Sequence, residues 1–517
     1  MSDMLFHAIS VAILMTGAIW NGYPIVYSDT SSYLASGFEL ETLVDRPITY
    51  GVFSRITSFN GTTLWTVIMA QCLLLSIILR RTLDLLEIRS DVRKLLIILV
   101  TSMATGITFV SGQLIPDIFT PILLLSCFLL IADPEPVKLL MLAIYIVAFS
   151  MHMSHIPIML LVLLIVAIHF LFFNKRKLRT RLLPITIVSL IGIIPMGVSI
   201  SKSSHVFFMA RMAENGILQE FLKENCDKDR YRLCQAGNIP RDANAFMWDP
   251  QGPMQLFATW ADSKDEFERI ISTSFKVPKY QLMHAEALIR STVRQLASSQ
   301  IADGTGVFGP GTLMYQRLAK FVPEELDRYE NSRQSRSLLQ PATLSALIRM
   351  HDVVLLLSVA YLLIFLVIRL IRKRVTGINT MAVIFVAAII LINAICTGGM
   401  VVVAPRFGTR VIWLLPLMAL IMILQQENVR AIKNSIRIRP KTRVAKGPLS
   451  SHREKITTLL RFSPLISTLL LLVFSVPAQT ESFLACEKSW LRKWHETRRD
   501  PHRSIASSTT NFACASC

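Results

Sequence analysis

Ten apolar runs, each of about 15–21 residues, dominate this sequence. An α-helix rises about 1.5 Å per residue, so about 20 apolar residues cross the roughly 30 Å hydrocarbon core of a bilayer. The runs therefore predict an all-α polytopic membrane protein with about 10 transmembrane helices, or 11 if a further run at 463–479 also crosses. The ten runs lie at about 4–20, 61–79, 94–112, 114–132, 137–151, 155–173, 183–201, 353–371, 378–398 and 409–425.

The composition agrees with this class of protein. Hydrophobic residues make up 52% of the 517-residue chain and charged residues 17%, whereas soluble domains contain about 25% charged residues. The formal net charge is +19, but the basic residues cluster in short segments between apolar runs, where membrane orientation requires them. We therefore expect membrane lipid, and no nucleic acid, as the partner of these segments.

The basic residues also predict the orientation. With a cytoplasmic N-terminus, the loops that fall inside are rich in Lys and Arg, as the positive-inside rule requires. The first outer loop, 21–60, has only Arg46 and Arg55 against four acidic residues. We expect an integral protein of the bacterial inner membrane. The inside loops contain Arg80, Arg81, Arg89, Arg93, Lys94, Lys138, Lys175, Arg176, Lys177, Arg179, Arg181, Arg369, Arg372, Lys373 and Arg374.

The same topology divides the chain into modules. A long polar segment with helical signals separates two groups of apolar runs and falls outside; it has enough residues for a small domain. The predicted modules are a transmembrane module at 1–201 with its outer loop 21–60, a mainly helical extracytoplasmic domain at 202–352, a transmembrane module at 353–425, a basic cytoplasmic segment at 426–462, and an extra span with a disordered tail at 463–517.

The cysteines follow this division. Cys226 and Cys234 flank "DKDRYRL" in the outer segment, where an oxidising compartment favours a disulfide. The alternative is two unpaired thiols. The chain ends in "CASC", which has the CxxC spacing of redox and metal sites but no second pair.

Ionisable and aromatic side chains stand at the predicted outer ends of several runs, all on one side of the membrane. Such groups are costly in lipid and tend to line a wet cavity. Ordinary alternatives exist: helix caps for the aspartates, a loop ion pair, hydrogen-bonded interfacial histidines, and arginines that mark the membrane boundary. The residues are Tyr27, Asp29, Tyr33, Asp45, Arg46, Asp117, His152, His155, Arg406 and Arg410.

This layout resembles the GT-C superfamily of integral membrane glycosyltransferases over about residues 1–200 and 378–425. The first outer loop has an acidic residue beside Tyr in "YSDTSSYL", and "DRPITYGVF" leads into the second run. A later acidic residue opens "PDIFTPILLL", and an Arg-aromatic motif precedes a Pro-containing run in "PRFGTRVIWLLPLMAL". Arg46 stands where the family often has His.

The resemblance implies a sugar donor linked to polyprenyl phosphate and an acceptor glycan, lipid or protein on the outer face. Asp29 would be the general base of an inverting transfer, and Arg406 or Arg410 would stabilise the departing phosphate. Tyr27 or Tyr33 would contact the sugar. The first loop has no DxD pair, so we assign no metal ligand, while a divalent metal stays an open alternative.

Two other functions are compatible with the sequence. One is a transporter or flippase for a lipid-linked or anionic substrate, although such proteins carry their charges near the midplane on broken helices of repeated halves. The other is a non-catalytic membrane scaffold whose outer domain binds a partner. No Walker A, G-x-S-x-G or H-E-x-x-H motif is present.

Overall fold

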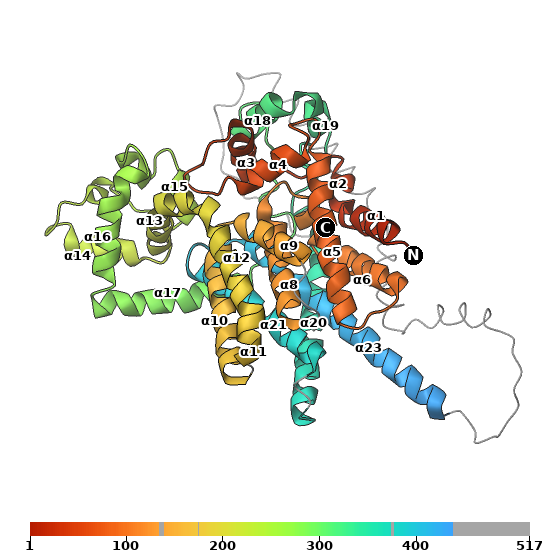
Figure 1. Ribbon diagram of the computed structural model, residues 1–517. Helices are drawn as coiled ribbons and strands as arrows, with labels where there is room; N and C mark the ends of the chain where they lie inside the picture. The colour runs from red at the N-terminus through yellow and green to blue at the C-terminus, as the bar shows by residue number, and fades with distance from the viewer. Residues whose placement is uncertain (134–138, 174, 374–376, 438–517) are drawn as a thin grey trace, which may run out of the picture. The chain divides into compact units, whose positions relative to one another are not determined.

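A computed structural model of the chain describes residues 1–133, 139–173, 175–373 and 377–437 (Figure 1). The secondary-structure elements of these residues are all helices, as predicted, and one isolated parallel bridge joins Ile25 to Gln113. The chain divides into two units, Met1–Ile436 and Arg437–Cys517. The predicted span at 463–479 and the terminal cysteines belong to the second unit and lie outside the described residues.

Among the described residues, five helices are long and apolar enough to cross a membrane. Each coincides with one of the predicted runs, which supports a membrane protein. The candidate spans are α5 (Trp65–Leu85), His155–Phe172 of α10 (His155–Phe173), α20 (Ser345–Ile371), α21 (Ile378–Ala394) with the π-turn η8 (Ile395–Gly399), and Pro405–Gln425 of α22 (Pro405–Ile412) and α23 (Leu414–Arg437).

The other predicted runs are also helical, but they are short or broken, so the count of about 10 spans is not confirmed. One pair of helices passes the same test together but is bent by 82° between its halves. If this pair is counted as one span, the number of candidate spans rises to six. These elements are α1 (Asp3–Leu14), α2 (Thr16–Asn21), α6 (Asp91–Ala104), α7 (Ile107–Gly112), η1 (Pro116–Ile118), α8 (Phe119–Ala132), α9 (Leu139–Ser150), α11 (Lys175–Lys177), η2 (Leu178–Leu182), α12 (Leu183–Ile193), η3 (Ile194–Met196) and α13 (Gly197–Glu214).

Close backbone packing accompanies two of these breaks. The helices α2 and α7 meet so tightly that a Cβ on Gly17 would lie 2.4 Å from the carbonyl oxygen of Thr108. A Cβ on Gly112 would lie 3.1 Å from the nitrogen of Ala18. Small residues permit this approach of the two backbones.

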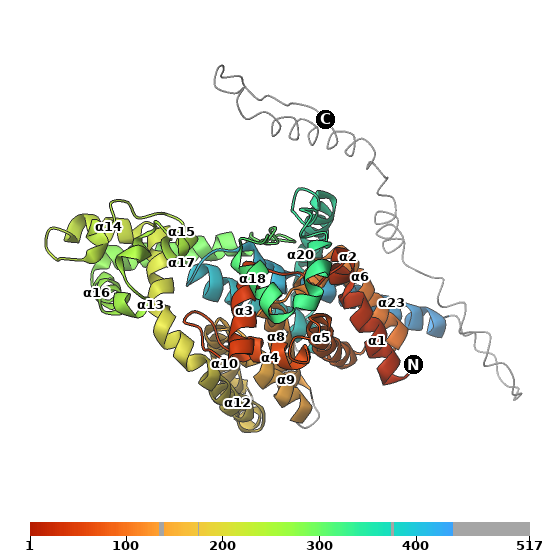
Figure 2. The same ribbon diagram turned by 90° about the horizontal axis from the view of Figure 1, so that it is seen from above.

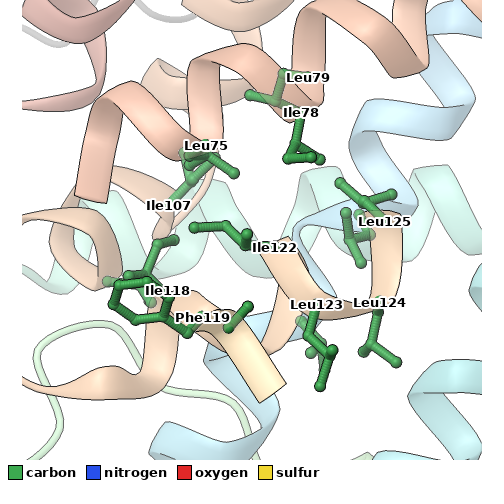
Figure 3. Close-up of a cluster of buried hydrophobic side chains, with 14 of the residues drawn as sticks. Leu75, Ile78, Leu79, Ile107, Ile118, Phe119, Ile122, Leu123, Leu124 and Leu125 are labelled. Carbon is green, nitrogen blue, oxygen red and sulfur yellow. The ribbon is translucent and has the colours of Figure 1, made fainter. Parts of the chain in front are cut away.

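The main core lies around α8. Residues 119–130 of α8 are all buried, as expected for a helix that is apolar on every side. Figure 3 shows Ile122 and Leu125 of α8 beside Leu75 and Ile78 of α5. This core holds the segment that carries Asp117 at a fixed position.

The segment 202–352, which the sequence predicts to lie outside, has two parts with different cores. Its first part has a core of its own, formed by α13 and the helices α14 (Ile217–Asn225), α15 (Ala243–Trp248), α16 (Lys264–Ser274) and α17 (Pro278–Leu296), which group together in Figures 1 and 2. A disulfide joins the predicted pair, Cys226 and Cys234, within it.

The second part packs on the transmembrane core instead. It contains α18 (Leu313–Phe321) and α19 (Leu326–Glu330). Glu325 accepts hydrogen bonds from Tyr23 at 3.1 Å and from the backbone of Leu64 at 3.0 Å. Gln334 bonds both backbone groups of Val26, at 3.0 and 2.7 Å. The second part therefore closes over the first outer loop, which contains α3 (Ser28–Glu39) and α4 (Thr49–Thr57).

Candidate functional site

Asp29 lies in the first turn of α3, where a carboxylate interacts favourably with the helix dipole. Thr30 fixes this turn because its hydroxyl accepts a bond from the Tyr27 N–H at 2.9 Å and donates to the Leu114 carbonyl at 2.9 Å. The start of α3 is therefore tied to the chain segment just before Asp117. Two sequence motifs about 90 residues apart thus become neighbours.

Two guanidinium groups hold the Asp29 carboxylate. Arg406 donates to Oδ2 at 2.7 Å, and Arg46 lies 3.3 Å from Oδ1. Arg46 also bonds Asp45 and donates to the Asp29 carbonyl at 3.3 Å. Burial opposes ionisation of Asp29, but the attraction of Arg406 and Arg46 outweighs it and lowers the pKa of this carboxyl to about 2.

Aromatic rings and a second carboxylate position the two arginines. Arg406 stacks over the Tyr27 ring at 4.8 Å, and Arg46 stacks over the Tyr33 ring at 5.2 Å. The backbone N–H of Arg406 donates to Asp303. Burial raises the pKa of Asp303, and the hydrogen bond from Arg406 partly opposes this shift.

Arg410, one helical turn after Arg406, is the buried centre of a polar network. It is 0% exposed and donates to Asp117 at 3.2 Å, to Asn393 at 2.8 Å and to Ser154 at 3.1 Å. The second oxygen of Asp117, Oδ2, is buried and has no hydrogen-bond partner within the described part of the chain.

The two predicted histidines form hydrogen bonds with other groups of the protein. His155 uses both ring nitrogens, with the Thr120 hydroxyl at 2.9 Å and the Phe149 carbonyl at 3.2 Å. His152 bonds the Ser154 hydroxyl at 2.8 Å, and burial together with Arg410 lowers the pKa of its imidazole. A neutral imidazole supplies no positive charge for a phosphate. His152 adjoins the Arg410 network through the Ser154 hydroxyl, which both side chains contact.

A pocket beside Arg406 collects polar side chains from three segments of the chain. Asp117 and Arg406 both line it, whereas Asp29 reaches it only through its ion pair with Arg406. The polar lining residues are Gln113, Asp117, Gln300, Asp303, Arg406 and Thr409. The unpartnered oxygen of Asp117 suits a hydrogen-bond donor such as a hydroxyl group.

The predicted residues thus gather in two adjacent networks on successive turns of α22. One contains Tyr27, Asp29, Tyr33, Asp45, Arg46 and Arg406, and the other contains Asp117, His152, His155 and Arg410. Sequence reasoning missed Asp303 and Asn393. For Asp303 the available signal was an acidic residue in the glycine-rich stretch "IADGTGVFGPG". For Asn393 it was a lone Asn in the apolar stretch "IILINAIC".

No arrangement of three or more His, Cys, Asp or Glu side chains that would hold a metal ion occurs in residues 1–133, 139–173, 175–373 and 377–437.

No family model, curated protein or solved structure matches this chain. The resemblance to GT-C glycosyltransferases therefore depends on the short motifs alone, and the function it implies is a proposal.

Proposed function

We propose that the protein is a membrane glycosyltransferase of the GT-C type, which moves a sugar from a polyprenyl-phosphate donor to an acceptor on the outer face. The observation that supports this proposal is the Asp29 carboxylate held between Arg46 and Arg406. One contact network then contains a carboxylate that can accept a proton and two guanidinium groups that can bind a phosphate.

The resting network also indicates how the site would be switched on. With its pKa at about 2, Asp29 is a weak base, because general bases work best with a pKa near the operating pH. Guanidinium groups bind phosphate oxygens with paired hydrogen bonds. A donor phosphate would compete with Asp29 for Arg406 and Arg46. Once released from these partners, Asp29 becomes the stronger base that the reaction needs.

The transfer is a single displacement. Asp29 takes the proton of the acceptor hydroxyl while that oxygen bonds to the anomeric carbon. The bond from this carbon to the phosphate oxygen breaks, and its electron pair leaves with the phosphate. Arg406 stabilises the added negative charge. One displacement inverts the anomeric configuration. Protonated Asp29 then returns its proton to water.

The two tyrosines have different roles in this proposal. Tyr33 is 4% exposed and serves to position Arg46. Tyr27 is only half-buried, and Arg406 lies over its ring at 4.8 Å. It is therefore the better candidate for contact with the sugar.

Polyprenyl phosphate without a sugar is the direct probe for the phosphate site. Arg406→Ala removes a charged hydrogen-bond donor, which is worth about 1.5–3 kcal/mol, so binding to the purified full-length protein weakens by about 10- to 150-fold. Asp29→Asn removes the competing carboxylate, so binding stays equal or becomes tighter. Glu39→Gln, on α3 but paired with Arg317 and Lys320, is the matched control and binds normally.

Sugar release from a mixture of polyprenyl-phosphate sugars then tests the chemistry. We expect wild type to cleave one of them and Asp29→Asn to do so about 10²–10⁴ times more slowly. Full transfer by Asp29→Asn would contradict the role of Asp29. Movement of the intact lipid-linked sugar across a vesicle bilayer without cleavage would favour the transporter alternative.

A further inference from the structure

Helix α17 exposes a continuous line of apolar side chains to the outside of the protein. Leu282, Ile289 and Val293 are 72%, 67% and 60% exposed. Such residues at intervals of three and four form one face of a helix. The set Leu282, Ala285, Ile289, Val293 and Leu296 is called here the α17 stripe.

The opposite face of α17 is already used. Tyr280, His284 and Ala287 are buried, and His284 stacks on Phe275 at 4.5 Å and bonds the Ser274 hydroxyl at 2.9 Å. The α17 stripe therefore points away from the core of its own domain. In Figure 1, α17 forms the edge of this group of helices, with α14–α16 on its other side.

Contacts with the neighbouring spans fix the depth of α17. A Cβ on Gly398 would lie 2.4 Å from Gln295 Cβ, and one on Gly399 would lie 2.5 Å from the Thr292 hydroxyl. These glycines end the span Ile378–Gly399. The Gln295 side chain also bonds both backbone groups of Ala404, at 2.9 and 3.0 Å, just before the next span begins.

Thus the C-terminal half of α17, with Thr292 and Gln295, is attached where one candidate span ends and the next begins, which is the level expected for the membrane–water interface. In Figure 1 it runs across the direction of α10 and not along it. We infer that the α17 stripe lies in the interfacial layer of the bilayer, against phospholipid acyl chains and headgroups. The flanking pair Glu286 and Arg290 is placed to reach the headgroups.

Phospholipid accounts for this position better than a second copy of the chain does, because α17 contacts the chain at the junction of two candidate spans, where a bilayer is present whether or not a second copy binds. The inference needs only the membrane spans and does not depend on the proposed sugar transfer. It adds a second point of membrane attachment, through the domain that contains Cys226 and Cys234.

Site-directed spin labelling of the full-length protein in phospholipid nanodiscs tests whether the α17 stripe contacts lipid. A nitroxide label is attached to a Cys introduced at Leu282 or Ile289, and its accessibility to oxygen, which dissolves in lipid, is divided by its accessibility to a water-soluble nickel chelate. This ratio should be several-fold higher than the ratio measured with the label at Glu268. Glu268, on the neighbouring helix α16, is the matched exposed control. The background variant replaces by Ser the three cysteines of the tail, Cys486, Cys514 and Cys517.

The label at Val293 repeats the measurement one turn further along, should either other variant fail to give a monodisperse protein. A stripe reached by the nickel chelate as readily as Glu268 would face water and would overturn the inference. Exclusion of both reagents would show that protein covers the stripe, a second copy included, and would overturn it equally.

Discussion

Replacement of Arg410 by Met should be strongly destabilising. The substitution keeps an unbranched side chain but removes the donors to Asp117, Asn393 and Ser154. Asp117 is 2% exposed and, in the described part of the chain, has no other ion-pair partner. A buried charge left without its partner costs about 3–5 kcal/mol, so the free energy of unfolding should fall by that amount.

The double variant Arg410→Met with Asp117→Asn separates the ion pair from the packing. Because Asn carries no charge, the double variant should recover about 2 kcal/mol relative to the sum of the two single changes. The assay is unfolding of the purified full-length protein in mixed micelles by increasing SDS, followed by circular dichroism. A single Arg410→Met cost below about 1 kcal/mol, or additive effects in the cycle, would refute the reasoning.

Two further predictions concern the surroundings of Asp29. Gly304→Ala should lower the free energy of unfolding by more than about 1 kcal/mol and weaken polyprenyl-phosphate binding, because Gly304 has φ +68° and a Cβ there would lie 1.9 Å from the Tyr27 ring. The control is Gly306→Ala, whose Cβ would meet nothing within 4 Å and which should be neutral in both assays. Because the pKa of Asp29 is lowered to about 2, its stabilisation is complete above about pH 4 and is lost as the pH falls toward 2. The difference in unfolding free energy between wild type and Asp29→Asn, measured from pH 6 to pH 2.5, should therefore shrink over that window, and a constant difference would contradict the ion pairs.

The sequence was informative where the signal is local. Apolar runs predict helices, and five of them are long enough to span a membrane. The expectation that Asp29 and Arg406 meet, although they are 377 residues apart, came from placing both at the same membrane face. That reasoning did not predict which arginine pairs with which aspartate, because the choice depends on how α22 packs between α3 and η1.

The remaining features depend on contacts between distant residues. The breaks between α1 and α2 and between α6 and α7 accompany the approach of Gly17 to Thr108, which no single segment reveals. His155 was predicted as a site residue, and its partners Thr120 and Phe149, which bind both of its ring nitrogens, could not be read from the sequence. Asp303 was missed because its stretch has the composition of an ordinary loop, and only the position of Arg406 shows its role.

The bonds from Glu325 and Gln334 to the first outer loop impose an order on biosynthesis. Gln334 follows Val26 by 308 residues, and ribosomes add about 5–20 residues per second. The loop that carries Asp29 therefore waits about 15–60 s before its final partners emerge. During this interval the acidic start of α3 lacks both Arg406 and its covering segment, so the nascent chain carries the Asp29 carboxylate for that time without the ion pair to Arg406 that it has in the complete fold.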